Sequence, residues 1–186
     1  MPVSRPDAAS SPPAGYRVGP RRRALLALAA ALLSGGVGSA RALERPVGTV
    51  LLSVSGRVRN PNAGARVDFD MAMLEALPQS SFSTRTPWFA QARRFTGPLL
   101  RDVLAACGAQ GTQLRLIALN DYRVDMPFED CQRHDVIVAR LLDGQAMAVR
   151  DKGPLFVVYP FDAQPELRSA TYYTRSAWQL RAIEVL

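Results

Sequence analysis

The N-terminal segment decides how much of this 186-residue chain is left to fold as a domain. The arginines Arg21–Arg23 precede an unbroken apolar run of ten residues, Ala24–Leu33, and a stretch rich in small residues then ends at Ala40-Arg41-Ala42. These are the three parts of a cleavable secretory signal. A run of ten apolar residues is too short to span a bilayer, which needs about 20. We therefore expect residues 1–42 to be a signal peptide, with an uncleaved anchor as the alternative, and residues 43–186 to be one exported domain.

The export route stays open between twin-arginine transport and ordinary secretion. The pair Arg22-Arg23 lies just before Leu25-Leu26, and Arg41 places a charge beside the expected cleavage site, as in twin-arginine signals. No Ser or Thr directly precedes the pair, which favours ordinary secretion. Either route predicts a periplasmic protein that has no membrane span after cleavage.

The positive charge of the chain is concentrated in the expected signal peptide. Residues 1–42 hold six of the 23 basic and one of the 16 acidic side chains, which leaves 17 basic and 15 acidic over 144 positions, a net charge of +2. Such a balance argues against a nucleic-acid partner. A chain of this length buries a core without disulfides. Cys107 falls on an apolar helical pattern and is expected to be buried, and pairing with Cys131 stays open.

Short apolar runs separated by turn signals predict a β-rich chain. Strands are expected at 50–54, 65–69, 81–86, 114–119, 155–159 and 178–185, with a hairpin over 136–149 that turns at Asp143-Gly144. A short helix is expected after Asp70, its cap, with Met73, Leu74 and Leu77 buried. A second helix is expected to have Pro98 at its first position and to stop at Gly108. We therefore expect an α+β fold, a β-rich mixed sheet with barrel-like character and short helices.

Common catalytic patterns are missing from the chain. His134 is the only histidine, and its polar neighbours predict a solvated loop residue. The sequence holds neither a P-loop nor a GxGxxG motif, so nucleotide sites of those types have no support. We assign no catalytic residue and no metal ligand.

Four loop segments at strand ends combine arginine, aromatic, amide and glycine residues: 84–88, 120–122, 150–154 and 173–178. Indole and phenol rings stack on a flat heterocycle, and amides, hydroxyls and guanidinium groups read its edge. Basic side chains beside glycine amides suit a phosphate. The candidate cofactor-binding residues are Arg85, Thr86, Trp88, Asn120, Asp121, Tyr122, Arg150, Lys152, Gly153, Arg175, Ser176 and Trp178.

Three stretches, Phe95–Leu104, Gly153–Pro160 and Ser176–Val185, stand in the order and spacing of a known family. Through them the chain, from about residue 48 to 186, resembles the oxidoreductase molybdopterin-binding domain family, which has the sulfite oxidase-type fold. The family places a molybdenum-binding cysteine in the strand before the first stretch. That segment reads Phe82–Trp88 here and contains no cysteine, and Trp178 stands where catalytic members tend to have a basic residue. A molybdenum centre requires such a soft sulfur ligand.

The resemblance implies a cofactor that is a pterin, either molybdopterin or a simpler pterin, and leaves molybdenum without its cysteine ligand. The chain is similar in size to cysteine-lacking members that are periplasmic pterin-binding regulators. By that resemblance the pterin-loaded protein is non-catalytic and binds the periplasmic domain of a membrane GGDEF/EAL enzyme of cyclic-di-GMP turnover. The alternatives are a periplasmic molybdopterin-dependent oxidoreductase and a ligandless scaffold or assembly factor.

Overall fold

Three open sheets carry the part of the chain that this computed structural model describes, residues 43–186. The predicted signal peptide lies outside the described residues. The domain is mixed α+β, rich in sheet and with only short helices, as the sequence predicted. The barrel-like character was wrong, because β2 and β6, the edge strands of the largest sheet, do not pair with each other, and the other two sheets stay separate.

The strands, in chain order, are β1 (Leu52–Gly56), β2 (Val67–Phe69), β3 (Gln79–Thr86), β4 (Phe89–Pro98), β5 (Gln113–Ala118), β6 (Arg123–Pro127), β7 (Ile137–Ala139), β8 (Leu141–Leu142), β9 (Gln145–Ala146), β10 (Phe156–Val158) and β11 (Leu180–Val185). The helices are α1 (Met71–Ala76), α2 (Leu100–Ala106), α3 (Asp130–Arg133) and α4 (Ala170–Arg175), with 3-10 turns at Val149–Asp151 and Pro165–Leu167. None of the described helices is long and apolar enough to cross a membrane.

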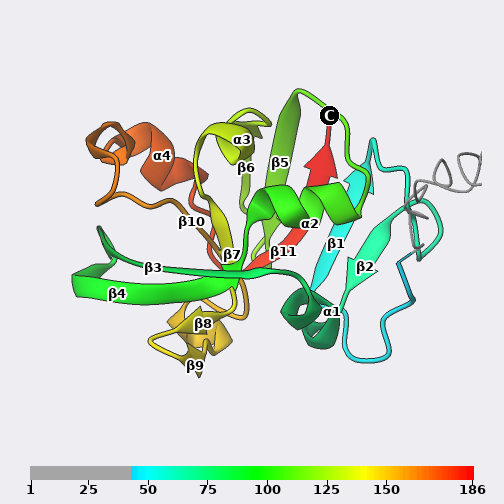
Figure 1. Ribbon diagram of the computed structural model, residues 1–186, viewed down its shortest axis with the longest axis horizontal. Coiled ribbons are helices and arrows are strands. Elements are labelled where there is room, and N and C mark those ends of the chain that lie inside the picture. Colours follow the sequence, from blue (N-terminus) through cyan, green and yellow to red (C-terminus); the bar gives the residue numbers. More distant parts are fainter. Residues whose placement is uncertain (1–42) are drawn as a thin grey trace, which may run out of the picture. The chain divides into compact units, whose positions relative to one another are not determined.

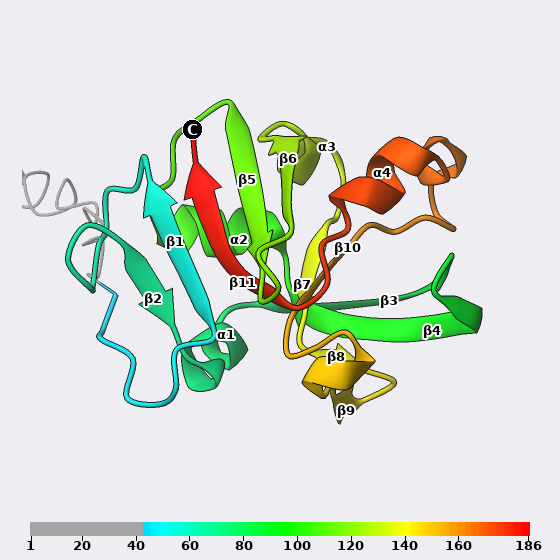
Figure 2. The ribbon, with the colours of Figure 1, turned by 180° about the vertical axis from the view of Figure 1, so that it is seen from behind.

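The largest sheet has the strand order β2-β1-β11-β5-β6, in which β1 and β11 are parallel and the other neighbours antiparallel. Helix α2 lies across one face of this sheet, and the opposite face carries no helix (Figures 1 and 2). Burial alternates along its strands accordingly, with Leu52 and Val54 buried and Ser53 and Ser55 only half-buried between them. A sheet with one packed and one solvated face produces this period of two.

Strands β3 and β4 form a long hairpin that extends away from the five-stranded sheet, on the same side of the domain as α4 (Figures 1 and 2). Strand β4 was not predicted from the sequence, because its residues 90–94 are small or polar and show no apolar alternation. Strand β6 and helix α4 were also not predicted. The tip of the hairpin, Pro87-Trp88, lies close to α4, because Trp88 packs against Tyr173 of that helix.

Helix α2 begins two residues later than predicted. Pro98 is the last residue of β4, and Leu99 precedes the helix in an extended conformation. At Gly97 an added Cβ would lie 2.0 Å from the carbonyl oxygen of Val138, so the close approach of two strands requires glycine here. Gly108, with a φ of 61°, ends the helix as predicted.

The two-residue turn at Asp143-Gly144 is confirmed, with φ values of 48° and 81°. Its hairpin is shorter than predicted, because β8 and β9 have two residues each. The preceding strand β7 pairs with β10 instead.

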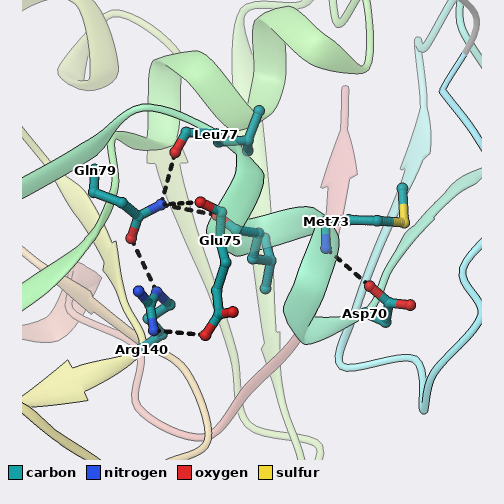
Figure 3. A network of polar contacts seen from close by, with 7 residues as sticks. Asp70, Met73, Glu75, Leu77, Gln79 and Arg140 are labelled. Carbon is teal, nitrogen blue, oxygen red and sulfur yellow. Dashed lines mark hydrogen bonds and ion pairs between the residues drawn. The ribbon is translucent and has the colours of Figure 1, made fainter.

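Asp70 caps α1 as predicted, through the contact with Met73 that Figure 3 shows, and it also holds the chain that precedes β1. Its carboxylate accepts the N–H of Met73 at 2.9 Å and the N–H groups of Val47 and Gly48 at 2.9 and 2.8 Å. Of the apolar residues predicted to be buried in this helix, Leu74 is fully buried, whereas Met73 and Leu77 are half-buried.

A second set of polar contacts closes the other end of α1. Arg140 donates to Glu75 Oε1 and to Gln79 Oε1, both at 2.9 Å, and the Gln79 amide in turn donates to the carbonyl oxygens of Leu74 and Leu77 (Figure 3). The last carbonyl groups of the helix thus find donors, and the segment before β8 is joined to β3.

Replacing Asp70 by alanine is expected to lower the free energy of unfolding at pH 7 by about 1–2 kcal/mol, as for other helix caps. Donation from the N–H of Gly48, and then of Met73, holds the pKa of this carboxyl below its usual value. Its contribution is therefore present above about pH 4 and is lost as the pH falls through the lowered pKa. Urea unfolding should show that the difference in free energy of unfolding between Asp70→Ala and the wild type is smaller in acid than at pH 7. The control Asp151→Ala, at an exposed position, should stay close to the wild type at both pH values. A difference in free energy of unfolding that grows in acid would contradict the capping role of the Asp70 carboxylate.

Candidate functional site

A cleft of about 390 Å³ brings together three of the four predicted loop segments. Its walls come from the tip of the β3–β4 hairpin, the β5–β6 loop, and α4 with the residues after it. The residues that line it are Trp88, Asn120, Tyr122, Tyr173, Thr174, Ser176 and Trp178. Five of these are predicted candidates, and they come from parts of the chain far apart in sequence.

One wall of the cleft is aromatic and rigid. The Trp88 ring lies edge-on to Phe156, with centroids 5.3 Å apart, and edge-on to Tyr173 at 6.2 Å. Phe156 is fully buried in the core, and Trp88 is half-buried. Trp88 is therefore held by core packing on one side and contributes to the cleft on the other.

Trp178 also lines the cleft, and 41 % of this residue is exposed. The Lys152 ammonium lies 3.3 Å from the centroid of this indole, an attractive contact between a cation and a π face. Partial burial lowers the pKa of Lys152, and no carboxylate among the described residues pairs with it. Lys152 thus covers one face of the indole, while 41 % of Trp178 remains exposed at the cleft.

Gly153 has a packing role beside that lysine. It is buried, and an added Cβ would lie 2.0 Å from the carbonyl oxygen of Met147. The 150–154 segment does not line the cleft. It supports Trp178 through Lys152, and it has glycine at position 153 because two backbone segments meet there. Arg150 points into solvent with 88 % of its side chain exposed, and its contact with Asp151 at 3.5 Å is weak.

Polar groups lie along the edge of the cleft. Asn120 Oδ1 accepts the Tyr122 N–H at 3.2 Å, so the amide NH₂ of Asn120 is left to donate to a ligand. The hydroxyls of Thr174 and Ser176 donate to carbonyl oxygens of α4 at 2.8 and 2.9 Å, which leaves them acceptor capacity only. Asp121 does not line the cleft, because it pairs with Arg181.

Arg85 and Thr86 line a neighbouring cavity of about 290 Å³. Its other lining residues are Pro87, Asp162, Arg168 and Tyr173. Because Tyr173 borders both spaces and Thr86 lies two residues before Trp88, the two cavities adjoin.

Arg175 belongs to a buried polar network instead of the cleft. Its guanidinium donates to Asp130 Oδ2 at 2.9 Å, and the Tyr159 hydroxyl donates to the same oxygen at 2.8 Å. Burial, and then the Asp130 charge, raises the pKa of Tyr159 far above its ordinary value. The network ties α4 to α3, so Arg175 holds the helix that carries Tyr173.

The interpretation of His134 as a solvated residue was wrong. Its side chain is buried, its Nδ1 lies 2.6 Å from Gln164 Oε1, and its ring packs edge-on against Tyr172 at 5.7 Å. Gln164 and Tyr172 lie 30 and 38 positions further along the chain, so the sequence around His134 held no sign of them.

Sequence reasoning placed Tyr173 and Thr174 in a candidate segment but not among the candidate residues, and it missed Asp162 and Arg168 altogether. The Tyr172-Tyr173 pair was a usable signal for an aromatic wall. Asp162 and Arg168 follow no motif, and only the cavity that they line brings them into view.

The described residues do not fit a molybdenum centre. They contain no group of three or more His, Cys, Asp or Glu side chains placed to hold a metal ion. Cys107 and Cys131 are free and buried, and burial raises the pKa of each thiol to about 12. Neither is a thiolate at neutral pH, so neither supplies the soft ligand that such a metal requires.

Comparison with protein-family models and with curated proteins gives no match to this chain. The chemistry of the cleft is therefore the ground for the functional assignment.

Proposed function

We propose that the exported domain binds a pterin in the cleft between Trp88 and Trp178, without catalysing a reaction on it. The observation that carries the proposal is the convergence of two indoles and two phenols around a cleft whose edge holds amide and hydroxyl groups. A pterin is a flat heterocycle with donors and acceptors along its edges, and it needs both kinds of contact.

The size and chemistry of the cleft suit such a ligand. Its volume of about 390 Å³ lies within the range of small-molecule sites. In this proposal the exposed part of the Trp178 indole stacks on the ring, and the Asn120 amide donates to a ring nitrogen or carbonyl. Lys152 beside the indole adds positive charge for an electron-rich ring edge.

The sulfite oxidase-type fold is part of the same proposal. The three resembling stretches include the end of β4 with α2, then β10, and then β11. The second and third meet through a bridge between Phe156 and Trp178, and the first meets β7, the partner of β10, through a bridge between Leu99 and Ile137. Of the three stretches, the third lines the cleft through Ser176 and Trp178, and the second supports it through Phe156, which packs against Trp88. The missing thiolate favours a pterin-binding protein over the oxidoreductase alternative.

The signalling role rests on the resemblance and on the surface around the cleft. Six large hydrophobic residues among those described have more than 40 % of their surface exposed. Val47 and Val50 precede β1, and the other four are Leu119, Tyr122, Val149 and Trp178. Tyr122 and Trp178 line the cleft. Gln179, the residue after Trp178, accepts the Leu119 N–H on its carbonyl oxygen and donates from its side-chain amide to the Val149 carbonyl oxygen. An apolar rim of this kind favours a protein partner. We propose the periplasmic domain of a membrane GGDEF/EAL enzyme.

The first test measures the pterin and the molybdenum bound to protein that has been purified from the periplasm of its own host. Mass spectrometry and pterin fluorescence should detect bound pterin, and metal analysis of the same sample should find no stoichiometric molybdenum. Protein without pterin that also fails to bind 6-hydroxymethylpterin on titration would overturn the binding function. Stoichiometric molybdenum would restore the oxidoreductase alternative.

The signalling role has a separate test in that host. Deleting the gene should change the cellular cyclic-di-GMP level, and complementation with the wild type or with Arg133→Gln, an exposed control on α3, should restore it. Complementation with Trp178→Ala should fail. Equal cyclic-di-GMP levels in all strains would remove the signalling role and leave the binding function standing.

A further inference from the structure

The cavity beside the cleft holds two arginines and one carboxylate, Arg85, Arg168 and Asp162, and so carries a net positive charge. Asp162 is already engaged on both oxygens. Its Oδ1 accepts Arg168 at 2.8 Å, and its Oδ2 accepts the backbone N–H of Arg85 at 2.9 Å. The guanidinium of Arg85 itself makes no ion pair with any described residue, and its side chain is exposed.

Asp162 and its partners give this cavity a defined shape. Besides Asp162, Arg168 donates to the Phe161 carbonyl oxygen at 3.0 Å, and the Asp162 N–H donates to Thr84 Oγ1 at 3.0 Å. The segment 161–168 is thereby joined to the end of β3. The carboxylate fixes the Arg168 guanidinium at the cavity and leaves its remaining N–H groups able to donate.

Thr86 adds a polar atom that has no partner. Only 8 % of this residue is exposed, and among the buried side-chain atoms of the described residues its Oγ1 is the one without a hydrogen bond. A buried hydroxyl without a partner is costly, and valine would fill the same space in a strand without that cost. This oxygen is covered by neighbouring atoms, so a polar group in the cavity supplies the missing partner when those atoms move aside.

We infer that this cavity is an oxyanion subsite, which takes a carboxylate or phosphate carried on the heterocycle bound in the adjoining cleft. The inference rests on the proposed function, because Tyr173 borders both spaces and Thr86 lies two residues before Trp88 in the chain. Arg85 and Arg168 donate to the oxyanion, and the Thr86 hydroxyl donates a further hydrogen bond. The natural ligand is thus an anionic heterocycle and not a neutral one.

The test compares a neutral with an anionic ligand on the full exported domain. Fluorescence titration should show pterin-6-carboxylate binding roughly tenfold to a hundredfold more tightly than 6-hydroxymethylpterin, the value of a hydrogen bond to a charged group. Arg85→Gln should remove this advantage and leave the affinity for 6-hydroxymethylpterin unchanged. Arg133→Gln, an exposed arginine paired at 3.7 Å with Glu129, loses the same charge and should change neither affinity. The phosphate ester of 6-hydroxymethylpterin, measured in parallel, tells which oxyanion the subsite prefers.

Thr86→Val separates a ligand-binding role from a structural one. Because the hydroxyl lacks a partner, the variant should have a Tm at least equal to that of the wild type. A gain of about 3 °C is expected if the full cost of the unpartnered hydroxyl is recovered. The same variant should weaken binding of pterin-6-carboxylate several-fold and leave binding of 6-hydroxymethylpterin unchanged. A fall in Tm, or equal effects on the two ligands, would overturn the role of Thr86.

The outcomes distinguish the two proposals. If both pterins bind equally well and Arg85→Gln changes neither, the oxyanion subsite is wrong and the pterin function stands. If neither pterin binds, the proposed function falls and the subsite falls with it.

Discussion

Trp178→Ala is expected to weaken pterin binding about tenfold to a hundredfold while the domain stays folded. Stacking of a flat base on an aromatic side chain contributes about 1–3 kcal/mol when measured by alanine substitution. Trp178 is 41 % exposed and holds the Lys152 ammonium on one face, so its removal costs the fold about 1 kcal/mol or less. Fluorescence titration with 6-hydroxymethylpterin and thermal unfolding of the same sample measure both effects.

Two further tryptophan variants sharpen this result. Trp178→Phe keeps an aromatic face and should retain most of the affinity. Trp88→Ala should lose both affinity and stability, because Trp88 packs against the buried Phe156. Wild-type affinity in Trp178→Ala would refute stacking on this indole. An unfolded variant would make Trp178 part of the core.

Asp130→Ala is expected to lower the free energy of unfolding by about 3–5 kcal/mol, the cost of breaking a buried ion pair from one side. The variant leaves the Arg175 guanidinium, 22 % exposed, without its carboxylate, and leaves the Tyr159 hydroxyl without its acceptor. Because Arg175 is the last residue of α4, pterin affinity should fall as well, although Asp130 does not line the cleft. Urea unfolding gives the first quantity and titration the second.

The double variant Asp130→Ala/Arg175→Met shows whether the stability lost in Asp130→Ala comes from the unpaired Arg175 charge. Removing the stranded charge should recover a large part of the lost stability, since an apolar replacement of a buried pair costs little. Asp135→Ala, which breaks the exposed pair with Arg101, should cost about 1 kcal/mol or less. A double variant as unstable as Asp130→Ala would show that the loss comes from packing and not from the unpaired arginine.

Local sequence signals predicted the elements that local chemistry controls. Asp70 caps its helix, Gly108 ends the next, and Asp143-Gly144 turns a hairpin, because each depends on a few adjacent backbone groups. Strand β4 escaped prediction for the converse reason. Its residues 90–94 carry no apolar pattern, and the pairing with β3 and β8 makes it a strand.

In the candidate site, too, some features were predictable from local sequence and others depend on tertiary contacts. A loop at a strand end that holds Trp88 or Trp178 signals a ligand surface from residue type alone, and the structure brings both to one cleft. Arg175 and Lys152 have the same residue chemistry in sequence, yet one is bound to a buried carboxylate and the other lies over an indole. Their partners, Asp130 and Trp178, lie 45 and 26 positions away in the chain.

The sequence by itself determined the class of this protein: an α+β domain of short strands and capped helices, with aromatic and basic residues collected in its loops. Tertiary structure alone decided that the sheets stay open, that His134 and Arg175 serve the interior, and that Arg85, Thr86 and Arg168 share a cavity. The physical reason is the distance along the chain over which each interaction is satisfied. Caps and turns are satisfied within a few residues, whereas burial and charge pairing depend on groups that only the folded chain brings within a few ångströms.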